Sequence, residues 1–160
     1  MKRILVAHAL YGESFSEYPG FELIKPQKGA FSSEELMQLI PTCHAFISMF
    51  NTPVPAALLQ AGEKLEIVSN VGVGYDNIDV EAATQKGIIV VNSPDGNTNA
   101  AAEHTVAMML SMVRNIPNAC LSTKEGKWDR AKFTGVEVFG KTLGVIGLGK
   151  IGSHVAKVAL

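Results

Sequence analysis

The stretch "EIVSNVGVGYDNIDVEAATQKGIIVVN", residues 66–92, decides the fold, because it holds two strand-like runs separated by one helix-like segment. The runs at 66–71 and 87–92 are short, rich in β-branched residues and bounded by turn-forming residues, which is typical of buried strands. The segment between them begins at Asp79, a favoured N-cap residue, and stops at Gly87, a favoured helix-terminating residue. A strand, a helix and a second strand in this order predict two parallel strands of one sheet.

The same alternation continues toward the N-terminus. Ser32 followed by Glu35 has the pattern of a capping box, and Pro55 stands near the first turn of a second helix, where its missing N–H does no harm. Short apolar runs precede and separate these helices at residues 3–8, 21–25 and 44–49. We therefore expect an α/β fold whose parallel sheet is covered by helices on both faces.

Toward the C-terminus the pattern changes to one long helix, expected over residues 99–114. This segment is rich in Ala and Met and apolar on most sides, so Met108, Met109 and Met112 are expected to be core residues. A helix that is buried nearly all round belongs between two packed bodies, such as two domains or two subunits. The more polar segment that follows predicts a short helix and then an extended arm.

The last stretch, "TLGVIGLGKIGSHVAKVAL" at residues 142–160, predicts a strand, a glycine turn and a helix. Gly147, Gly149 and Gly152 fit the pattern G-x-G-x-x-G, in which the glycines permit a tight turn, an approach of the backbone to a pyrophosphate, and close packing of helix on strand. The alternative is a glycine-rich turn without a ligand. An acidic residue about 20 positions further on would hold the ribose of the dinucleotide. It would lie beyond Leu160, so NAD and NADP remain alternatives.

A second glycine loop follows the strand-like run at 66–71. Gly72 and Gly74 stand where open α/β sheets place their ligands, and successive N–H groups at such a turn suit a carboxylate. The alternative is a tight turn in which Asp76 and Asp79 only cap the next helix. The local sequence leaves both interpretations open.

Composition excludes several classes of protein. The chain has 160 residues, 47% of them hydrophobic and 18% charged, with a net charge of −1, which is typical of a globular protein without a basic surface for nucleic acid. No run reaches the roughly 20 apolar residues of a membrane span. Cys43 and Cys120 have neither metal-ligand nor disulfide-framework spacing, which favours a reducing cytoplasm, and no metal site is expected. The short apolar run that includes His8 predicts a first strand rather than a signal peptide.

Three stretches together resemble the D-isomer-specific 2-hydroxyacid dehydrogenases, and within them most of all the D-3-phosphoglycerate dehydrogenases. They are "NVGVGYDNIDVEAATQKGIIVVNSPDGNTNAAAEHTVAMMLSMVRNIP", "GKWDRAKFTG" and "GKTLGVIGLGKIG". The resemblance is continuous from about residue 65 to residue 160, whereas residues 1–64 match only in their pattern of strands and helices.

The resemblance implies two domains. Residues 1–98 would form an incomplete flavodoxin-like substrate domain, and residues 99–160 the truncated first part of a Rossmann NAD-binding domain. The second part would contain an interdomain helix, an arm with Trp128 that helps to form a homodimer, and the first βα unit.

The resemblance also implies the roles of individual residues. The loop Val71, Gly72, Val73 and Gly74, together with Asn70 and Asn97, would bind the substrate. The NAD or NADP cofactor would contact Val73, Thr105, Gly147, Gly149, Lys150, Ile151 and Gly152.

In this family hydride passes between the nicotinamide and C2 of a small 2-hydroxy or 2-keto acid. The arginine and the histidine–glutamate pair that complete the chemistry lie downstream of Leu160, so we expect no catalytic residue and no activity in these 160 residues alone. A nucleotide-binding fold needs several βαβ units, whereas only one strand and one helix are expected after Lys141. The last helix is therefore expected to expose Ile151, Val155, Val158 and Leu160. The alternatives are a non-catalytic dinucleotide-binding scaffold and an inactive truncated gene product.

One departure leaves the substrate open. Many phosphoglycerate dehydrogenases have an arginine at the position of Asn70, and asparagine offers no charged fork for a phosphate. The substrate is therefore either 3-phosphoglycerate or a plain acid of the glyoxylate or hydroxypyruvate type.

The other polar residues have ordinary structural explanations. Glu103 and His104 are adjacent, so on a helix they point about 100° apart and form no acid–base pair. Glu103 is expected to complement the helix dipole and His104 to pack between domains. Structural roles are also expected for His8, His44 and His154.

Overall fold

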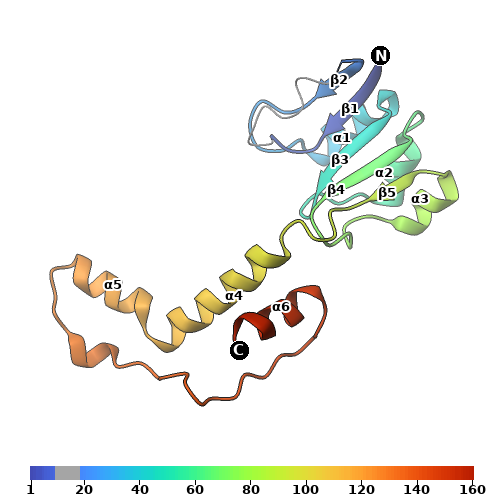
Figure 1. Ribbon diagram of the computed structural model, residues 1–160. Helices are drawn as coiled ribbons and strands as arrows, with labels where there is room; N and C mark the ends of the chain where they lie inside the picture. Colours follow the sequence, from blue (N-terminus) through green and yellow to red (C-terminus); the bar gives the residue numbers. More distant parts are fainter. Residues whose placement is uncertain (10–18) are drawn as a thin grey trace. The chain divides into compact units, whose positions relative to one another are not determined.

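A computed structural model describes residues 1–9 and 19–160 (Figure 1). The contacts between residues divide the chain into two compact units, the N-terminal unit, Met1–Gly96, and the C-terminal unit, Asn97–Leu160. Each unit has its own packing, and each is described separately below.

The N-terminal unit is built on a five-stranded sheet with the order β2-β1-β3-β4-β5, in which every pair of neighbours is parallel. The strands are β1 Lys2–Val6, β2 Phe21–Ile24, β3 Ala45–Met49, β4 Ile67–Val71 and β5 Ile89–Val91. Four lie within the runs that were expected to be strands, and β1 begins one residue before its run at 3–8, so the α/β class and the parallel sheet are confirmed (Figure 1).

Three helices of this unit begin and end where their sequences indicate. They are α1 Ser33–Leu39, α2 Ala56–Ala61 and α3 Val80–Lys86, with a short 3-10 helix, η1, at Ile40–Thr42. Both hydrogen bonds of the expected capping box form at α1, where Glu35 N donates to Ser32 Oγ and Ser32 N donates to a Glu35 carboxylate oxygen. At α3 the Asp79 side chain accepts from Ala82 N, and Gly87 ends the helix with φ +73°, a conformation that favours glycine.

The core lies between the sheet and these helices. Leu5, Phe46 and Val68 occupy paired positions on β1, β3 and β4 and are all fully buried. Each contributes about 2 kcal/mol by its burial. The expectation that helices cover both faces is not met among the described residues, because α1 packs on α2 and α2 on α3 over one face. On the other face Ile89 is 60% exposed.

The C-terminal unit contains α4 Thr98–Val113, α5 Ile116–Lys124, the 3-10 helix η2 Arg130–Phe133 and α6 Lys150–Val158 (Figure 1). Helix α4 packs against α6, and α5 packs against η2. The expected long helix, short helix and arm are thus present. In the described part of the chain no helix is both long enough and apolar enough to cross a membrane.

Two expectations about this unit were wrong. Met108 and Met112 are 59% and 71% exposed, because α6 covers only one side of α4 and these methionines face away from it. Conversely, Val155 is 8% exposed because this same packing covers it, and Ile151 is half-buried. Val158 and Leu160, by contrast, are exposed, as expected.

The strand expected before the glycine turn also does not form. Residues 141–148 adopt no regular secondary structure. A strand needs a hydrogen-bonded neighbour, and the described residues of the C-terminal unit include no other strand that could pair with it.

Candidate functional site

The loop after β4 lies at the edge of the sheet where all five parallel strands end. Within it Gly72 has φ +151°, which L-residues with a side chain rarely adopt. Val71 is 40% exposed, Gly72 and Val73 are half-buried, and Gly74 is exposed. The loop that was expected to bind the substrate is thus accessible.

Three successive carbonyl groups of this loop each accept a hydrogen bond. Ser93 N donates to Gly72 O at 2.9 Å. Asn92 Nδ2 donates to Val73 O at 2.7 Å, and Asn70 Nδ2 donates to Gly74 O at 2.6 Å. Two of the three donors follow β5 and the third lies in β4, so the ends of both strands hold the loop.

Asn70 lies inside this arrangement rather than on its surface. Its side chain is 1% exposed, and its Oδ1 accepts from Ser48 Oγ at 2.8 Å and from Asn77 Nδ2 at 3.3 Å. The side-chain contact with a substrate that was expected of Asn70 is therefore not available in this conformation. Instead Asn70 links the loop to β3.

Asn77 extends these hydrogen bonds to the segment that follows β3. Its Nδ2 donates to Met49 O at 3.1 Å and to Thr52 O at 2.8 Å, while its backbone carbonyl accepts from Val54 N at 2.7 Å. The Thr52 hydroxyl, in turn, lies 2.8 Å from His8 Nε2. The ends of β1, β3, β4 and β5 are thus held together by side-chain amides and hydroxyls.

The glycine turn of the C-terminal unit has the features expected of its pattern. Gly147 has φ +87°. A Cβ on Gly152 would lie 2.0 Å from Gly147 O, whereas a Cβ on Gly149, the N-cap residue of α6, would meet no atom within 4 Å. The third glycine therefore permits close packing, and the second leaves the backbone open to solvent.

Several of the residues expected to bind a cofactor line one cavity of about 330 Å³ within this unit. They are Thr105, Gly147, Ile151 and Gly152. The Thr105 hydroxyl donates to Ala101 O at 2.7 Å in its own helix. Gly149 and Lys150 lie between Gly147 and Gly152 in the sequence, but they are exposed and do not line this cavity. Asn97, which was expected to bind the substrate, is exposed and is the N-cap residue of α4.

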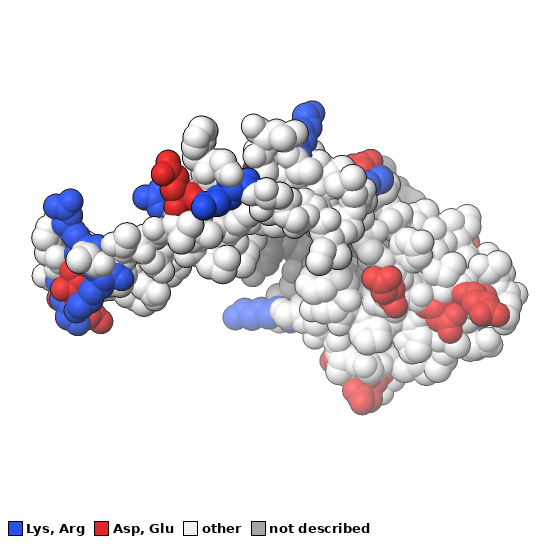
Figure 2. Space-filling model, turned by 90° about the horizontal axis from the view of Figure 1, so that it is seen from below, with Lys and Arg blue, Asp and Glu red and all other residues white. Residues whose placement is uncertain are grey.

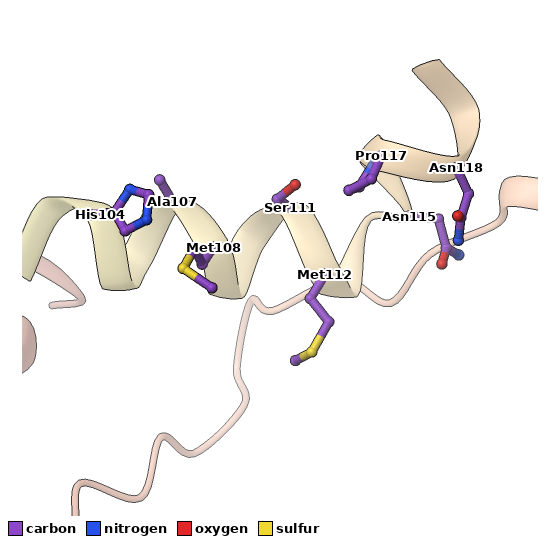
Figure 3. Close-up of a pocket in the computed structure, with 8 residues that line it drawn as sticks. All are labelled: His104, Ala107, Met108, Ser111, Met112, Asn115, Pro117 and Asn118. Atoms are coloured by element: carbon purple, nitrogen blue, oxygen red, sulfur yellow. The ribbon is translucent and has the colours of Figure 1, made fainter. Parts of the chain in front are cut away.

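A second hollow follows the side of α4 that carries His104, Met108 and Met112, and continues to Asn115 and Asn118 (Figure 3). Its volume is about 620 Å³. Glu103 does not line it, so the adjacent Glu103 and His104 do not face one space together. This is the geometry expected of two neighbours on a helix.

Charged side chains form no continuous basic surface on the face that Figure 2 shows, where Lys and Arg stand among Asp and Glu. In the C-terminal unit Lys127 pairs with Glu125 and Lys132 with Asp129. Among the described residues no group of three or more His, Cys, Asp or Glu side chains is arranged to hold a metal ion.

Residues 5–146 match the family of the D-isomer specific 2-hydroxyacid dehydrogenase, catalytic domain. The chain belongs to this family. Among its curated relatives is the D-3-phosphoglycerate dehydrogenase of Synechocystis, 54% identical over 132 residues, which are 82% of this chain and 24% of the relative. The chain spans between 24% and 30% of the length of such relatives.

Two solved structures of nicotinamide-dependent enzymes share the fold of this chain. The NAD-dependent formate dehydrogenase of Staphylococcus aureus, in complex with NAD, matches with a TM-score of 0.82 at 27% identity, covering 99% of this chain and 53% of that one. The NADPH-dependent glyoxylate/hydroxypyruvate reductase of Sinorhizobium meliloti, in complex with NADP and malonate, matches with a TM-score of 0.78 at 28% identity, covering 99% and 50%.

Two residues that shape the loop after β4 were not singled out from the sequence. Asn77 and Asn92 each donate to backbone carbonyl groups that lie 19 or more residues away in the sequence. Asn77 also donates to the nearer side chain of Asn70. Their positions at strand ends and after a glycine loop are the only local signals, because a hydrogen bond between distant segments leaves no periodic pattern.

Proposed function

We propose that residues 1–98 form the substrate domain, and residues 99–160 the first part of the nucleotide-binding domain, of an NAD(P)-dependent D-2-hydroxyacid dehydrogenase. The reaction moves hydride between the nicotinamide and C2 of a small 2-hydroxy or 2-keto acid. The arm that contains Trp128 takes part in a homodimer. Family membership and the conformation of the loop after β4 support this proposal.

The observation that carries the proposal is the loop Val71–Gly74. It lies at the carboxyl end of a parallel strand, it is accessible, and its N–H groups suit a carboxylate. The reductase of Sinorhizobium meliloti, whose fold is similar, was solved with the dicarboxylate malonate. In this chain the loop would bind the carboxylate and orient C2, and Val73 would also lie beside the nicotinamide.

The glycine turn would hold the pyrophosphate of the dinucleotide. Gly152 lets α6 begin close to Gly147, and Gly149 leaves room for the backbone to approach an anion. Lys150 and Ile151 follow at the start of α6, and Thr105 lines the adjoining cavity. The dinucleotide, when bound, supplies or accepts the hydride. Similar folds use NAD in one solved relative and NADP in another, so both are candidates.

The presence of Asn70 favours an unphosphorylated acid over 3-phosphoglycerate as the substrate. Its amide is buried and already engaged by Ser48, Asn77 and Gly74, and it carries no charge for a phosphate. The relatives named D-3-phosphoglycerate dehydrogenase favour the phosphorylated substrate. Both substrates therefore belong in the first assay.

The test is a kinetic assay on the complete gene product. NADH and NADPH oxidation is measured with glyoxylate and hydroxypyruvate, and NAD and NADP reduction with D-3-phosphoglycerate and D-glycerate. We expect turnover of at least one of these acids and none of its L-isomer where one exists. Dinucleotide binding without turnover of any acid would instead support the non-catalytic scaffold, and the absence of both would overturn the proposal.

A further inference from the structure

The loop after β4 has its three carbonyl groups turned toward the protein. Gly72 O, Val73 O and Gly74 O accept hydrogen bonds of 2.6–2.9 Å from Ser93 N, Asn92 Nδ2 and Asn70 Nδ2. All peptide bonds among the described residues are trans, so the C=O and the following N–H of each peptide point in opposite directions. Fixing these carbonyls therefore fixes the N–H groups of Val73, Gly74 and Tyr75.

These N–H groups point away from the donors that hold the carbonyls. Within the described part of the chain no hydrogen bond engages the N–H of Val73, Gly74 or Tyr75. An N–H without a partner is costly unless water or a ligand satisfies it. The chain is half-buried at Val73 and exposed at Gly74 and Tyr75, so water or a ligand can satisfy these donors.

The segment around the loop has no positively charged side chain that could attract an anion. Residues 65–85 contain no Lys or Arg. An anion at this loop therefore depends on the dipoles of the N–H groups, and dipoles attract a charge only when they are oriented toward it. The side chains that fix the orientation become as important as the donors themselves.

Asn92 is the more informative of the two asparagines. It is half-buried, whereas Asn70 is fully buried and also bonded to Ser48 and Asn77, so changes at Asn70 affect the packing of β3 on β4. The only hydrogen bond of the Asn92 side chain among the described residues is its donation to Val73 O. Its removal should alter the loop and leave the sheet intact.

We propose that Asn92 and Asn70 are positioning residues that orient the N–H groups of Val73, Gly74 and Tyr75 toward a carboxylate. This rests on the proposed function, since the carboxylate is that of the substrate. Neither side chain touches the substrate. Each acts by holding a carbonyl, and an aspartate of the same shape cannot replace it, because an ionised carboxylate has no hydrogen to donate.

The test compares Asn92→Asp and Asn92→Ala with the unaltered complete gene product. Oxalate, a small dicarboxylate, serves as the probe, and its binding is followed by hydrogen exchange of the peptide that spans residues 70–78. Three kinetic constants are also measured for each protein: the KM of the acid, kcat and the KM of the dinucleotide. A positioning role predicts a larger change in the first than in the other two. Gln60→Ala, which removes an exposed amide on α2, is the matched control.

We expect oxalate to slow exchange in the unaltered protein and in Gln60→Ala. In Asn92→Ala the oxalate affinity and 1/KM for the acid should fall roughly five- to tenfold, as expected for one lost hydrogen bond. In Asn92→Asp the oxalate affinity and 1/KM for the acid should fall further. In both variants kcat and the KM of the dinucleotide should change less. A purely structural role of Asn92 would lower the melting temperature and leave the KM of the acid unchanged.

Two failures can be told apart. If the unaltered protein binds oxalate and both variants bind it equally well, the positioning role is overturned and the proposed function stands. If oxalate does not protect the loop of the unaltered protein, both the positioning role and the assignment of the loop as the carboxylate site are overturned.

Discussion

The side chains of Ser48 and Asn70 lie opposite one another on β3 and β4, and the Ser48 hydroxyl donates to Asn70 Oδ1 at 2.8 Å. They are 0% and 1% exposed. Each stands two residues beyond a core residue of its strand, Phe46 or Val68, and so on the same face of the sheet. The apolar core thus ends in a buried polar pair directly beneath the loop Val71–Gly74.

This pair should contribute measurably to stability. Ser48→Ala removes one donor but leaves Asn70 Oδ1 its bond from Asn77, so we expect a loss of about 1 kcal/mol in the free energy of unfolding. Asn70→Ala removes the partner of Ser48, Asn77 and Gly74 and should cost about 2–3 kcal/mol. Urea unfolding of both single variants and the double variant measures this. Additive losses would show that the two side chains are not coupled.

Lys86 caps helix α2 from a distance. Its Nζ lies 2.6, 2.7 and 2.9 Å from the carbonyl oxygens of Leu59, Gln60 and Gly62, at the C-terminal end of that helix. Leu59 O and Gly62 O also accept from Gly62 N and Leu65 N, so the ammonium group adds a second donor to these two carbonyls, satisfies Gln60 O and complements the helix dipole. We expect Lys86→Met to lower stability by about 1–2 kcal/mol.

The matched control for this prediction is Lys64→Met. Lys64 is exposed, and its side chain has no hydrogen bond or ion pair among the described residues. Lys64→Met should change the free energy of unfolding by less than about 0.5 kcal/mol. If the two substitutions lower stability equally, the hydrogen bonds of Lys86 contribute nothing, and the loss reflects only the removal of a positive charge.

Local chemistry explains why much of the N-terminal unit was predictable. The capping box of Ser32 and Glu35, the N-cap Asp79 and the left-handed Gly87 act within a few residues of one another, so the sequence alone contains both partners. The strands were recognisable for the same reason, because short β-branched runs between turn residues need no knowledge of their neighbours.

Features that depend on distant segments were missed. The burial of Met108 and Met112 depends on what covers α4, and the residues of the run at 141–147 become a strand only beside another strand. The bond from Asn92 to Val73 O joins positions 19 residues apart. A pattern of residue types identifies the loop at Gly72, but the donors that orient it become apparent only from the packed sheet.

The two later glycines of the turn should behave differently when replaced by alanine. A Cβ at Gly152 would lie 2.0 Å from Gly147 O, far inside van der Waals contact, so Gly152→Ala should displace α6 from the turn and lower the melting temperature. Gly149→Ala meets nothing within 4 Å and has φ −78°, which alanine adopts freely.

Gly149→Ala therefore should fold like the unaltered protein but bind dinucleotide less tightly, since its methyl group would stand where the backbone approaches the pyrophosphate. Thermal unfolding and a fluorescence titration with NADH, both on the complete gene product, separate the two effects. Unchanged NADH affinity in Gly149→Ala would count against the turn as the pyrophosphate site. Unchanged stability in Gly152→Ala would contradict the close packing of α6.

The two cysteines should differ sharply in reactivity. Cys43 is fully buried, and its Sγ lies 3.2 Å from Leu39 O, whereas Cys120 is exposed on α5. Burial raises the pKa of the Cys43 thiol, which keeps it protonated. Because the thiolate is the reactive form, at about pH 8 a chromogenic disulfide reagent should label Cys120 quickly and Cys43 only after unfolding.

The same shift gives a pH dependence with a definite sign. A thiol whose pKa is raised by folding stabilises the fold fully below its ordinary pKa, and this contribution is lost as the pH rises through the raised value. Cys120→Ser isolates the buried thiol. We expect this variant to remain unlabelled under native conditions and to lose stability as the pH rises above 9.0, the ordinary pKa of the thiol. Rapid labelling of its native form would show that the segment around Cys43 opens readily.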